Sequence, residues 1–185
     1  KLILMPGRLT AWKGQELFIE ALNLVNKELG HQSFMAIILG TDQGRDIYTK
    51  KIKRLAEQYR LMPQLKFIEH FENMPLAYKI SNLVVSASIE PEAFGRVAIE
   101  AQSMEKPIIA SNIGGSNETV TNNVSGFLFE SNNAQSLSKR IIEVLNLDES
   151  RLKLMGIEGR KNVIKKFNVE KMCFSTYSEY KKLLN

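Results

Sequence analysis

Cysteine is almost absent from this sequence, and no apolar run in it is long enough to cross a membrane. The single cysteine, Cys173, has no partner for an internal disulfide and no companion at metal-ligand spacing, which indicates a reduced, intracellular protein without a zinc site. No stretch approaches the roughly 18 apolar residues that span a bilayer, and residues 1–7 are too short and wrongly flanked for a signal peptide. We therefore expect a soluble, cytoplasmic protein.

The composition is that of a folded domain with a modest positive charge. Hydrophobic residues make up 44% and charged residues 24% of the 185 residues, which excludes disorder as the main state and fits a single domain. The 25 basic against 20 acidic residues leave a formal charge of +5, which by itself does not choose among anionic ligands, nucleic acid and membrane surfaces. Acidic residues follow basic ones closely, and no aromatic residues interleave a basic stripe, so we expect no nucleic-acid partner.

Short apolar runs alternate with amphipathic segments along the chain. Runs that are apolar on both faces predict buried parallel strands, at residues 2–5, 34–39, 65–69, 83–86, 107–110 and 126–129. Apolar residues at three- and four-residue spacing predict helices between and after them, at residues 15–29, 47–59, 75–80, 96–104, 134–145, 149–163 and 169–184. We therefore predict an α/β fold, a Rossmann-like doubly wound parallel sheet of about six strands with helices on both faces and a helical C-terminal tail. In such a sheet, ligands bind in the loops that follow the strands.

The loop after the first predicted strand carries two cations between two glycines. Gly7 and Gly14 bracket Arg8 and Lys13 just before a predicted helix. Two cations beside the exposed N–H groups of a helix N-terminus can hold a diphosphate, although two solvated surface cations would give the same pattern. The loop lacks the Gly-Lys-Ser/Thr of a Walker A motif, so a P-loop nucleoside triphosphatase is disfavoured.

The loop after the fourth predicted strand carries two carboxylates with seven residues between them. If Gly95 marks the start of a helix, Glu92 lies in the loop and Glu100 lies inside the helix. At 1.5 Å per residue the two carboxylates are up to about 12 Å apart, which is longer than a glycosidase acid and base pair needs. The spacing suits a ligand with hydroxyls at both ends and phosphates between them, as in a nucleotide sugar.

Two further loops follow predicted strands. Gly114 and Gly115 permit close backbone approach to a ligand, and Glu118 either receives a ligand hydroxyl or charges the start of a helix. The backbone of residues 69–73 is placed to meet the edge of a base. His70 in that loop fits a structural polar residue better than a catalyst.

Taken in order, these motifs resemble the carboxyl-terminal, donor-binding half of the retaining glycosyltransferases of the GT-B fold, in the large group-one family (family four type). The resemblance rests on Gly7-Arg-Leu…Lys13-Gly14, Ser86-Ala-Ser88…Glu92-Ala-Phe-Gly95…Glu100-Ala, Pro107-Ile-Ile-Ala-Ser111 and Gly114-Gly-Ser-Asn-Glu118. It implies catalytic roles for Arg8, Lys13 and Glu92, with Arg8 and Lys13 on the diphosphate, Glu92 on the sugar and Glu100 on the ribose. The donor-binding set that it implies is Gly7, Arg8, Lys13, Phe71, Glu92, Ala93, Phe94, Gly95, Arg96, Val97 and Glu100. Arg96 departs from the aliphatic residue common there, and it either adds a phosphate contact or is a surface change.

The resemblance also implies an activity. Residues 1–185 would form the nucleotide-sugar-binding domain of a two-domain enzyme that transfers a hexosyl group with retention, without a metal or another cofactor. The acceptor would be a saccharide or a lipid-linked saccharide in capsule, lipopolysaccharide or other envelope polysaccharide synthesis, and the full-length enzyme could associate peripherally with the inner face of the membrane. The chain opens on a strand without an initiator Met, and the N-terminal acceptor domain of the family is absent, so we expect this domain to be inactive alone. The alternatives are a non-catalytic, regulatory nucleotide-binding domain and half of a nucleotide-sugar epimerase.

Overall fold

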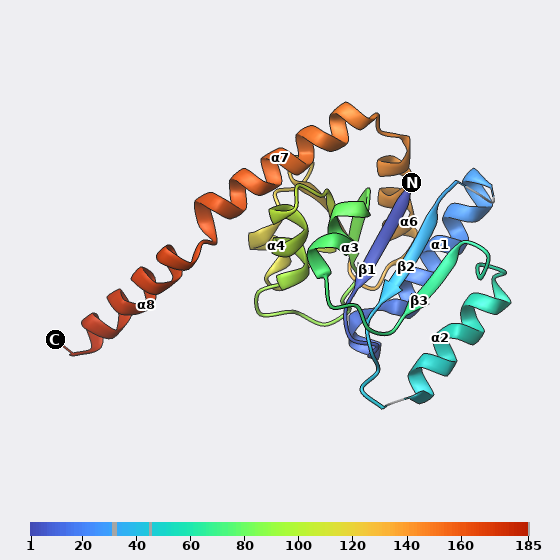
Figure 1. Ribbon diagram of the computed structural model, residues 1–185, viewed down its shortest axis with the longest axis horizontal. Helices are drawn as coiled ribbons and strands as arrows, with labels where there is room; N and C mark the ends of the chain where they lie inside the picture. The colour runs from blue at the N-terminus through green and yellow to red at the C-terminus, as the bar shows by residue number, and fades with distance from the viewer. Residues whose placement is uncertain (31–32, 45, 185) are drawn as a thin grey trace.

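The protein is built around one parallel sheet. The computed structural model describes residues 1–30, 33–44 and 46–184. Its six strands lie in the order β3-β2-β1-β4-β5-β6, and every neighbouring pair is parallel. Figure 1 shows β1, β2 and β3 side by side. The strands are β1 (Leu2–Pro6), β2 (Met35–Leu39), β3 (Leu65–Ile68), β4 (Leu83–Ser86), β5 (Ile108–Ser111) and β6 (Gly126–Phe129). All six predicted strands are confirmed, with boundaries shifted by at most one residue.

Helices connect and cover the strands. They are α1 (Gln15–Leu29), α2 (Asp46–Gln58), α3 (Met74–Ile80), α4 (Arg96–Ser103), α5 (Ser116–Thr119), α6 (Ala134–Asn146), α7 (Glu149–Lys166) and α8 (Val169–Leu184). Side chains cap several of them at the N-terminus: Asn73 begins α3, Asn133 begins α6 and Asp148 begins α7. The single-turn α5 and the 3-10 helix Ala11–Lys13 were not predicted, because one turn is too short to show a helical period.

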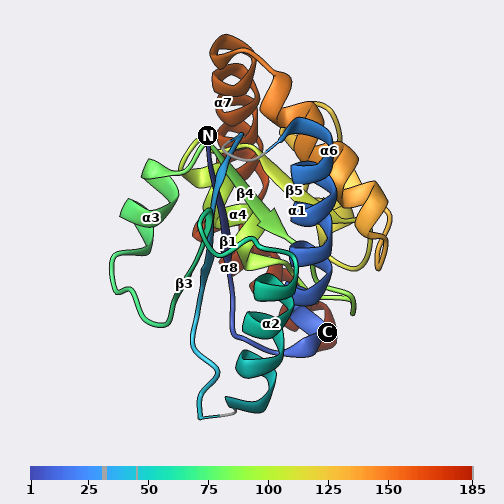
Figure 2. The ribbon, with the colours of Figure 1, turned by 90° about the vertical axis from the view of Figure 1, so that its right-hand side faces the viewer.

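Two apolar layers lie on the two faces of the sheet. Alternate residues of β1 supply both layers, with Ile3 and Met5 in one and Leu4 in the other. The first layer is completed by α1, α2 and α6, and the second by α3 and α4. Figure 2 shows α1 and α6 on one side of the strands and α3 on the other. The sheet is therefore doubly wound, as predicted.

The strand order reverses direction between β1 and β4, which pair directly through the registers Ile3↔Leu83 and Leu4↔Val84. Chain connections run outward from this point toward β3 on one side and β6 on the other. The loops that follow β1 and β4 therefore diverge at the carboxyl edge and leave a crevice, which is where doubly wound sheets bind ligands.

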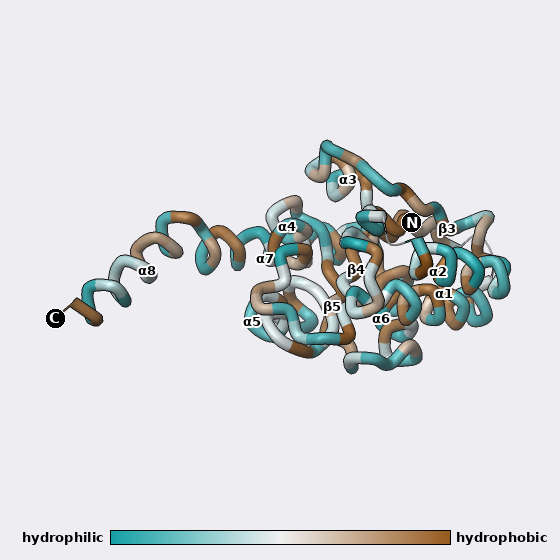
Figure 3. The backbone as a smooth tube through the Cα atoms, turned by 90° about the horizontal axis from the view of Figure 1, so that it is seen from below, coloured by the Kyte–Doolittle hydropathy of each residue, from teal (hydrophilic) through white to brown (hydrophobic). Residues whose placement is uncertain are grey.

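The last two helices lie at the end of the sheet beside α4. α7 packs against α4, whereas α8 runs away from the sheet and has no buried residue (Figure 1). In Figure 3, both hydrophobic and hydrophilic residues follow one another along α8. Among the described residues, none of the helices combines the length and the apolar character that a membrane span requires.

Candidate functional site

The loop after β1 turns the chain from the sheet into α1 within a few residues. The N–H of Gly7 donates to the carbonyl of Leu39 at the end of β2 (2.9 Å), and the 3-10 helix follows. Gly14 then adopts a left-handed conformation with φ 75° and lies against the loop after β4. The guanidinium of Arg8 is exposed and has neither an ion pair nor a hydrogen bond within the described ranges. Arg8 is therefore available to an anionic ligand.

Lys13 and Glu92 meet across the reversal point of the sheet. The Nζ of Lys13 lies 2.8 Å from Oε1 of Glu92, and the side chains are only 14% and 15% exposed. The hydroxyl of Ser88 donates a short hydrogen bond to the same carboxylate oxygen. The ammonium group also lies 4.4 Å from the centre of the Trp12 ring. The structure thus joins a predicted diphosphate-binding residue to a predicted sugar-binding residue.

Glu100 is held by a residue that the sequence reasoning missed. The hydroxyl of Tyr78 in α3 donates to Oε2 of Glu100 in α4 at 2.7 Å. Tyr78 is 2% exposed, and burial together with the hydrogen bond to Glu100 raises the pKa of its hydroxyl well above the usual value. Tyr78 therefore remains a donor at neutral pH. Oε1 of Glu100 has no hydrogen-bond partner in the part of the chain that the structure describes, so it is free to accept from a ligand hydroxyl.

The start of α4 lies between these two carboxylates along the chain. The helix begins directly after Gly95, as predicted; the φ of Gly95 is 75°, and no side chain caps the helix. The backbone N–H groups of Arg96 and Val97 have no acceptor within the helix, because they belong to its first turn. The side chain of Arg96 is exposed and has no ion pair among the described residues. A diphosphate placed here would meet free N–H groups, a helix dipole and guanidinium charge together.

Gly114 and Gly115 lie close to the backbone of the loop that follows β4. A Cβ on Gly114 would lie 2.6 Å from the carbonyl oxygen of Glu92, and one on Gly115 would lie 2.8 Å from that of Ala93. The N–H of Gly115 donates to the Glu92 carbonyl at 2.8 Å. These glycines therefore support the loop that carries Glu92. Their approach to a ligand stays a prediction, and Glu118 lies in the first turn of α5, where its charge suits the helix dipole.

Two predicted aromatic positions have different surroundings. Phe94 is 45% exposed and packs edge-on against Phe167 at the end of α7, with ring centres 5.6 Å apart. Phe71 is 38% exposed, and its loop follows β3, which lies two strands away from β1. Nothing in the structure brings Phe71 into contact with Lys13 or Glu92. His70 in the same loop lies 3.8 Å from Glu72 on the surface.

Sequence reasoning missed Ser88 and Tyr78 as parts of the site. Ser88 belongs to the Ser86-Ala-Ser88 motif, four residues before Glu92, and its position two residues after a predicted strand was the available signal. Tyr78 gave no comparable signal, because its pattern is that of an ordinary buried helix residue. The two residues act on the carboxylates by orienting them and supplying hydrogen bonds.

Comparison with known proteins identifies relatives of this arrangement. A family model described as Glycosyl transferases group 1 matches residues 1–162. A capsular polysaccharide biosynthesis glycosyltransferase, CapM of Staphylococcus aureus, is 35% identical over 106 residues, which is 57% of this chain and 27% of CapM. A glycosyltransferase structure from Rickettsia africae superposes with a TM-score of 0.91 at 36% identity, over 100% of this chain and 48% of that one. The Anabaena protein HepE, solved in complex with UDP and glucose, superposes with a TM-score of 0.86 at 26% identity, over 97% of this chain and 48% of that one.

Proposed function

This chain belongs to the group 1 glycosyltransferases, and on that premise we propose that its carboxyl edge binds a nucleoside diphosphate sugar whose sugar the protein transfers to an acceptor. The observation that carries the proposal is the Lys13–Glu92 ion pair across the reversal point of the sheet, with the free N–H groups of α4 and Glu100 beyond it. This edge offers carboxylates for hydroxyls at both ends of a ligand and positive charge between them. A nucleotide sugar has the matching order of ribose, diphosphate and sugar.

We assign each group a role. Arg8, Lys13 and the N–H groups at the start of α4 hold the diphosphate, and they stabilise the negative charge that develops as the nucleoside diphosphate departs. Glu92, oriented by Lys13 and Ser88, accepts from hydroxyls of the donor sugar. Glu100, oriented by Tyr78, accepts from the ribose hydroxyls. Transfer with retention of configuration and without a metal is the mechanism that the family resemblance implies, and it stays a prediction.

The donor base and the acceptor are also matters of proposal. HepE was solved with UDP and glucose, which supports a uridine diphosphate hexose as donor. The capsular role in the name of CapM supports an envelope saccharide, free or lipid-linked, as acceptor. The chain spans about half the length of the two solved structures. We therefore expect transfer to require residues outside the matched half, because both reactants must be held in near-attack geometry.

Removing either cation of the first loop tests the diphosphate assignment. We expect Arg8→Ala and Lys13→Ala to lower the affinity for UDP about tenfold or more while leaving the weak affinity for uridine unchanged, because only UDP presents the paired charge. The affinity for UDP should also fall as salt rises, since partly exposed ionic contacts are screened. Isothermal titration calorimetry measures all of these affinities.

Lys27→Ala is the matched control for these variants. Lys27 is exposed in α1, and its side chain has no ion pair within the described ranges, so its removal changes the net charge by the same amount. Its affinity for UDP should equal that of the wild type. Equal losses for UDP and uridine in the Arg8 and Lys13 variants would show that these residues support the fold and not the phosphates.

Glu92→Ala should separate sugar recognition from nucleotide recognition. Loss of the carboxylate frees Lys13 from its ion pair, so the affinity for UDP should stay equal or rise, while the added affinity that the sugar of UDP-glucose contributes should disappear. Competition calorimetry with UDP and UDP-glucose gives both values. Glu92→Gln retains the shape of the side chain and removes its charge, so it should lose a smaller part of the affinity that the sugar contributes. A uniform drop for both ligands would contradict the role assigned to Glu92.

A further inference from the structure

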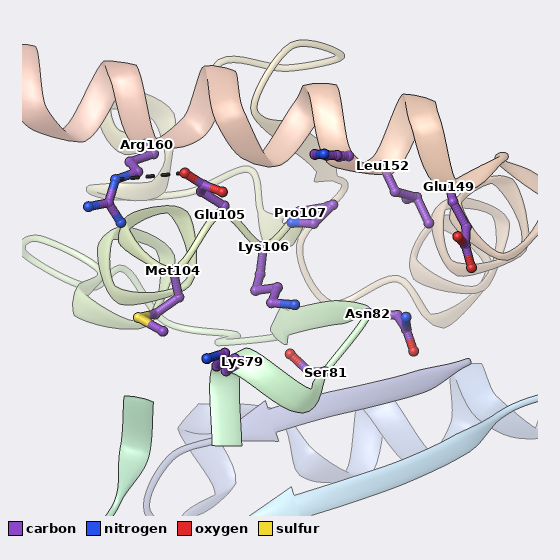
Figure 4. Close-up of a pocket in the computed structure, with 11 residues that line it drawn as sticks. Lys79, Ser81, Asn82, Met104, Glu105, Lys106, Pro107, Glu149, Leu152 and Arg160 are labelled. Atoms are coloured by element: carbon purple, nitrogen blue, oxygen red, sulfur yellow. Dashed lines mark ion pairs between the residues drawn. The ribbon is translucent and has the colours of Figure 1, made fainter. Parts of the chain in front are cut away.

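A cavity lies away from the proposed donor site. Its volume is about 760 Å³, and it opens at the amino ends of β4 and β5, on the opposite edge of the sheet. One wall is the end of α3 and the start of β4, a second is the turn between α4 and β5, and α7 forms the third (Figure 4). Nothing in the proposed donor chemistry uses these residues.

Positive charge dominates the lining. Four cations face two carboxylates, and one of the cations, Arg160, is already occupied by Glu105 at 3.8 Å and by the carbonyl of Ser103 at 2.5 Å. Lys79, Lys106 and Lys153 have no ion pair or hydrogen bond from their side chains among the described residues. The other carboxylate, Glu149, stands in the first turn of α7, where the helix dipole stabilises its negative charge. Three of the four cations therefore line the cavity without an ion pair among the described residues, and the lining carries more positive than negative charge.

Lys106 is the central group of this cavity. Figure 4 shows its ammonium group between Lys79 and Asn82, and its side chain is partly buried. Burial lowers the pKa of Lys106, the nearby Lys79 lowers it further, and Glu105 opposes the shift. Asn82 accepts from the N–H of Leu2 through Oδ1 at 2.7 Å, which orients its amide and leaves the NH₂ group without a partner in the part of the chain that the structure describes. The cavity thus offers a neutral donor beside the cations.

The walls of the cavity are fixed by close backbone contacts. A Cβ on Gly156 of α7 would lie 2.0 Å from the carbonyl oxygen of Glu105, so α7 rests directly on the turn that carries Lys106. The N–H of Lys106 donates to the carbonyl of Ala101 at the end of α4 at 2.9 Å. The backbone positions from which Lys106 and Lys153 extend therefore follow from the packing of α7 on the turn after α4.

We propose that this cavity binds a phosphate-bearing ligand, with Lys79, Lys106 and Lys153 around the phosphate and the amide of Asn82 donating to one of its oxygens. A phosphate group supplies the missing counter-charge and several strong acceptors at once, which a single carboxylate does not. The phosphate could belong to a small soluble molecule or to a lipid headgroup, and the chemistry of the cavity is the same for both. The site is separate from the donor site and does not depend on it.

Titration of the ¹⁵N-labelled chain with inorganic phosphate locates the binding. We expect the amide signals of residues 79–82, 104–106 and 149–153 to shift together in a saturable manner. Lys106→Gln, and Lys106→Gln combined with Lys153→Gln, should weaken this binding about tenfold or more. Lys139→Gln removes an equal charge from an exposed position of α6 and should change nothing. Each variant's spectrum also reports whether its fold is intact.

A second arm distinguishes the source of the phosphate. Wild-type protein and the Lys106→Gln variant are sedimented with vesicles of phosphatidylglycerol and of phosphatidylcholine. Binding to phosphatidylglycerol that falls in the Lys106 variant assigns the cavity to a lipid headgroup, whereas phosphate binding without vesicle binding assigns it to a soluble ligand. Phosphate shifts confined to residues 7–14 and 95–97, or unchanged in the folded Lys106 variant, would overturn the proposal and leave the donor site untouched.

Discussion

The Glu100→Ala variant is expected to bind UDP about ten- to a hundredfold more weakly than the wild type. A hydrogen bond to a charged group contributes about 1.5–3 kcal/mol, and each 1.4 kcal/mol is a factor of ten in affinity. Glu100 is oriented by Tyr78 and presents its second oxygen free of partners among the described residues, as a ribose-binding carboxylate requires. Calorimetry with UDP measures the change.

Tyr78→Phe is the companion variant for Glu100. It removes the hydroxyl that orients the carboxylate while keeping the charge and the buried ring, so its effect on the affinity for UDP should have the same sign and be smaller. Glu100→Ala should also weaken the binding of uridine, because the ribose is present in both ligands. If Glu100→Ala instead affected only UDP-glucose and not UDP, the assignments of Glu92 and Glu100 would be reversed.

The Gly14→Ala variant is expected to lower the free energy of unfolding by about 2–5 kcal/mol. Gly14 has φ 75°, and an added Cβ would lie 1.9 Å from the carbonyl oxygen of Ala87. The left-handed conformation disfavours any residue with a Cβ, and the collision with backbone atoms cannot be relieved by a rotamer change. The loop after β1 would have to move away from the loop after β4, which would also separate Lys13 from Glu92. Urea denaturation followed by circular dichroism measures the loss.

Gly95→Ala separates the two causes of this destabilisation. Gly95 has the same φ of 75° and the same left-handed conformation as Gly14, but a Cβ there would meet no described atom closer than 3.8 Å, which is an ordinary van der Waals contact. Its substitution therefore reports the backbone strain alone, which is about 1–2 kcal/mol. Gly14→Ala should lower the free energy of unfolding by clearly more than this. Equal losses in the two variants would mean that the loops after β1 and β4 are not in close contact in solution.

The strands could be predicted from the sequence because parallel strands buried on both faces are short, continuously apolar and followed by Gly, Ser or polar residues. The same patterns placed Arg8, Lys13 and Glu92 in loops at the carboxyl edge, and Glu100 in the helix that follows one of these loops. The sequence could not show that Lys13 pairs with Glu92, since this contact joins residues 79 positions apart and depends on the pairing of β1 with β4. It also could not show that Tyr78 supports Glu100, because that contact depends on how α3 and α4 pack on one face.

The cavity lined by lysines at the amino ends of β4 and β5 could not be predicted from the sequence either. Lys79, Lys106 and Lys153 come from three separate elements, and each reads in the sequence as a solvated surface lysine. Only the packing of α7 against the turn after α4 brings them to one cavity. Local sequence patterns therefore identified the loops at the carboxyl edge of the sheet. A cavity formed by elements that are distant in the sequence could be found only in the structure.

A crystal structure of this chain with UDP tests the central claim most directly. The account predicts the diphosphate beside Arg8, Lys13 and the N–H groups of Arg96 and Val97, with the ribose hydroxyls on Glu100. Lys13 should divide its contacts between Glu92 and the phosphate. UDP bound at the amino edge between Lys79 and Lys106, or bound at the carboxyl edge without contact to Lys13 and Glu100, would contradict the claim that the reversal point of the sheet is the donor site.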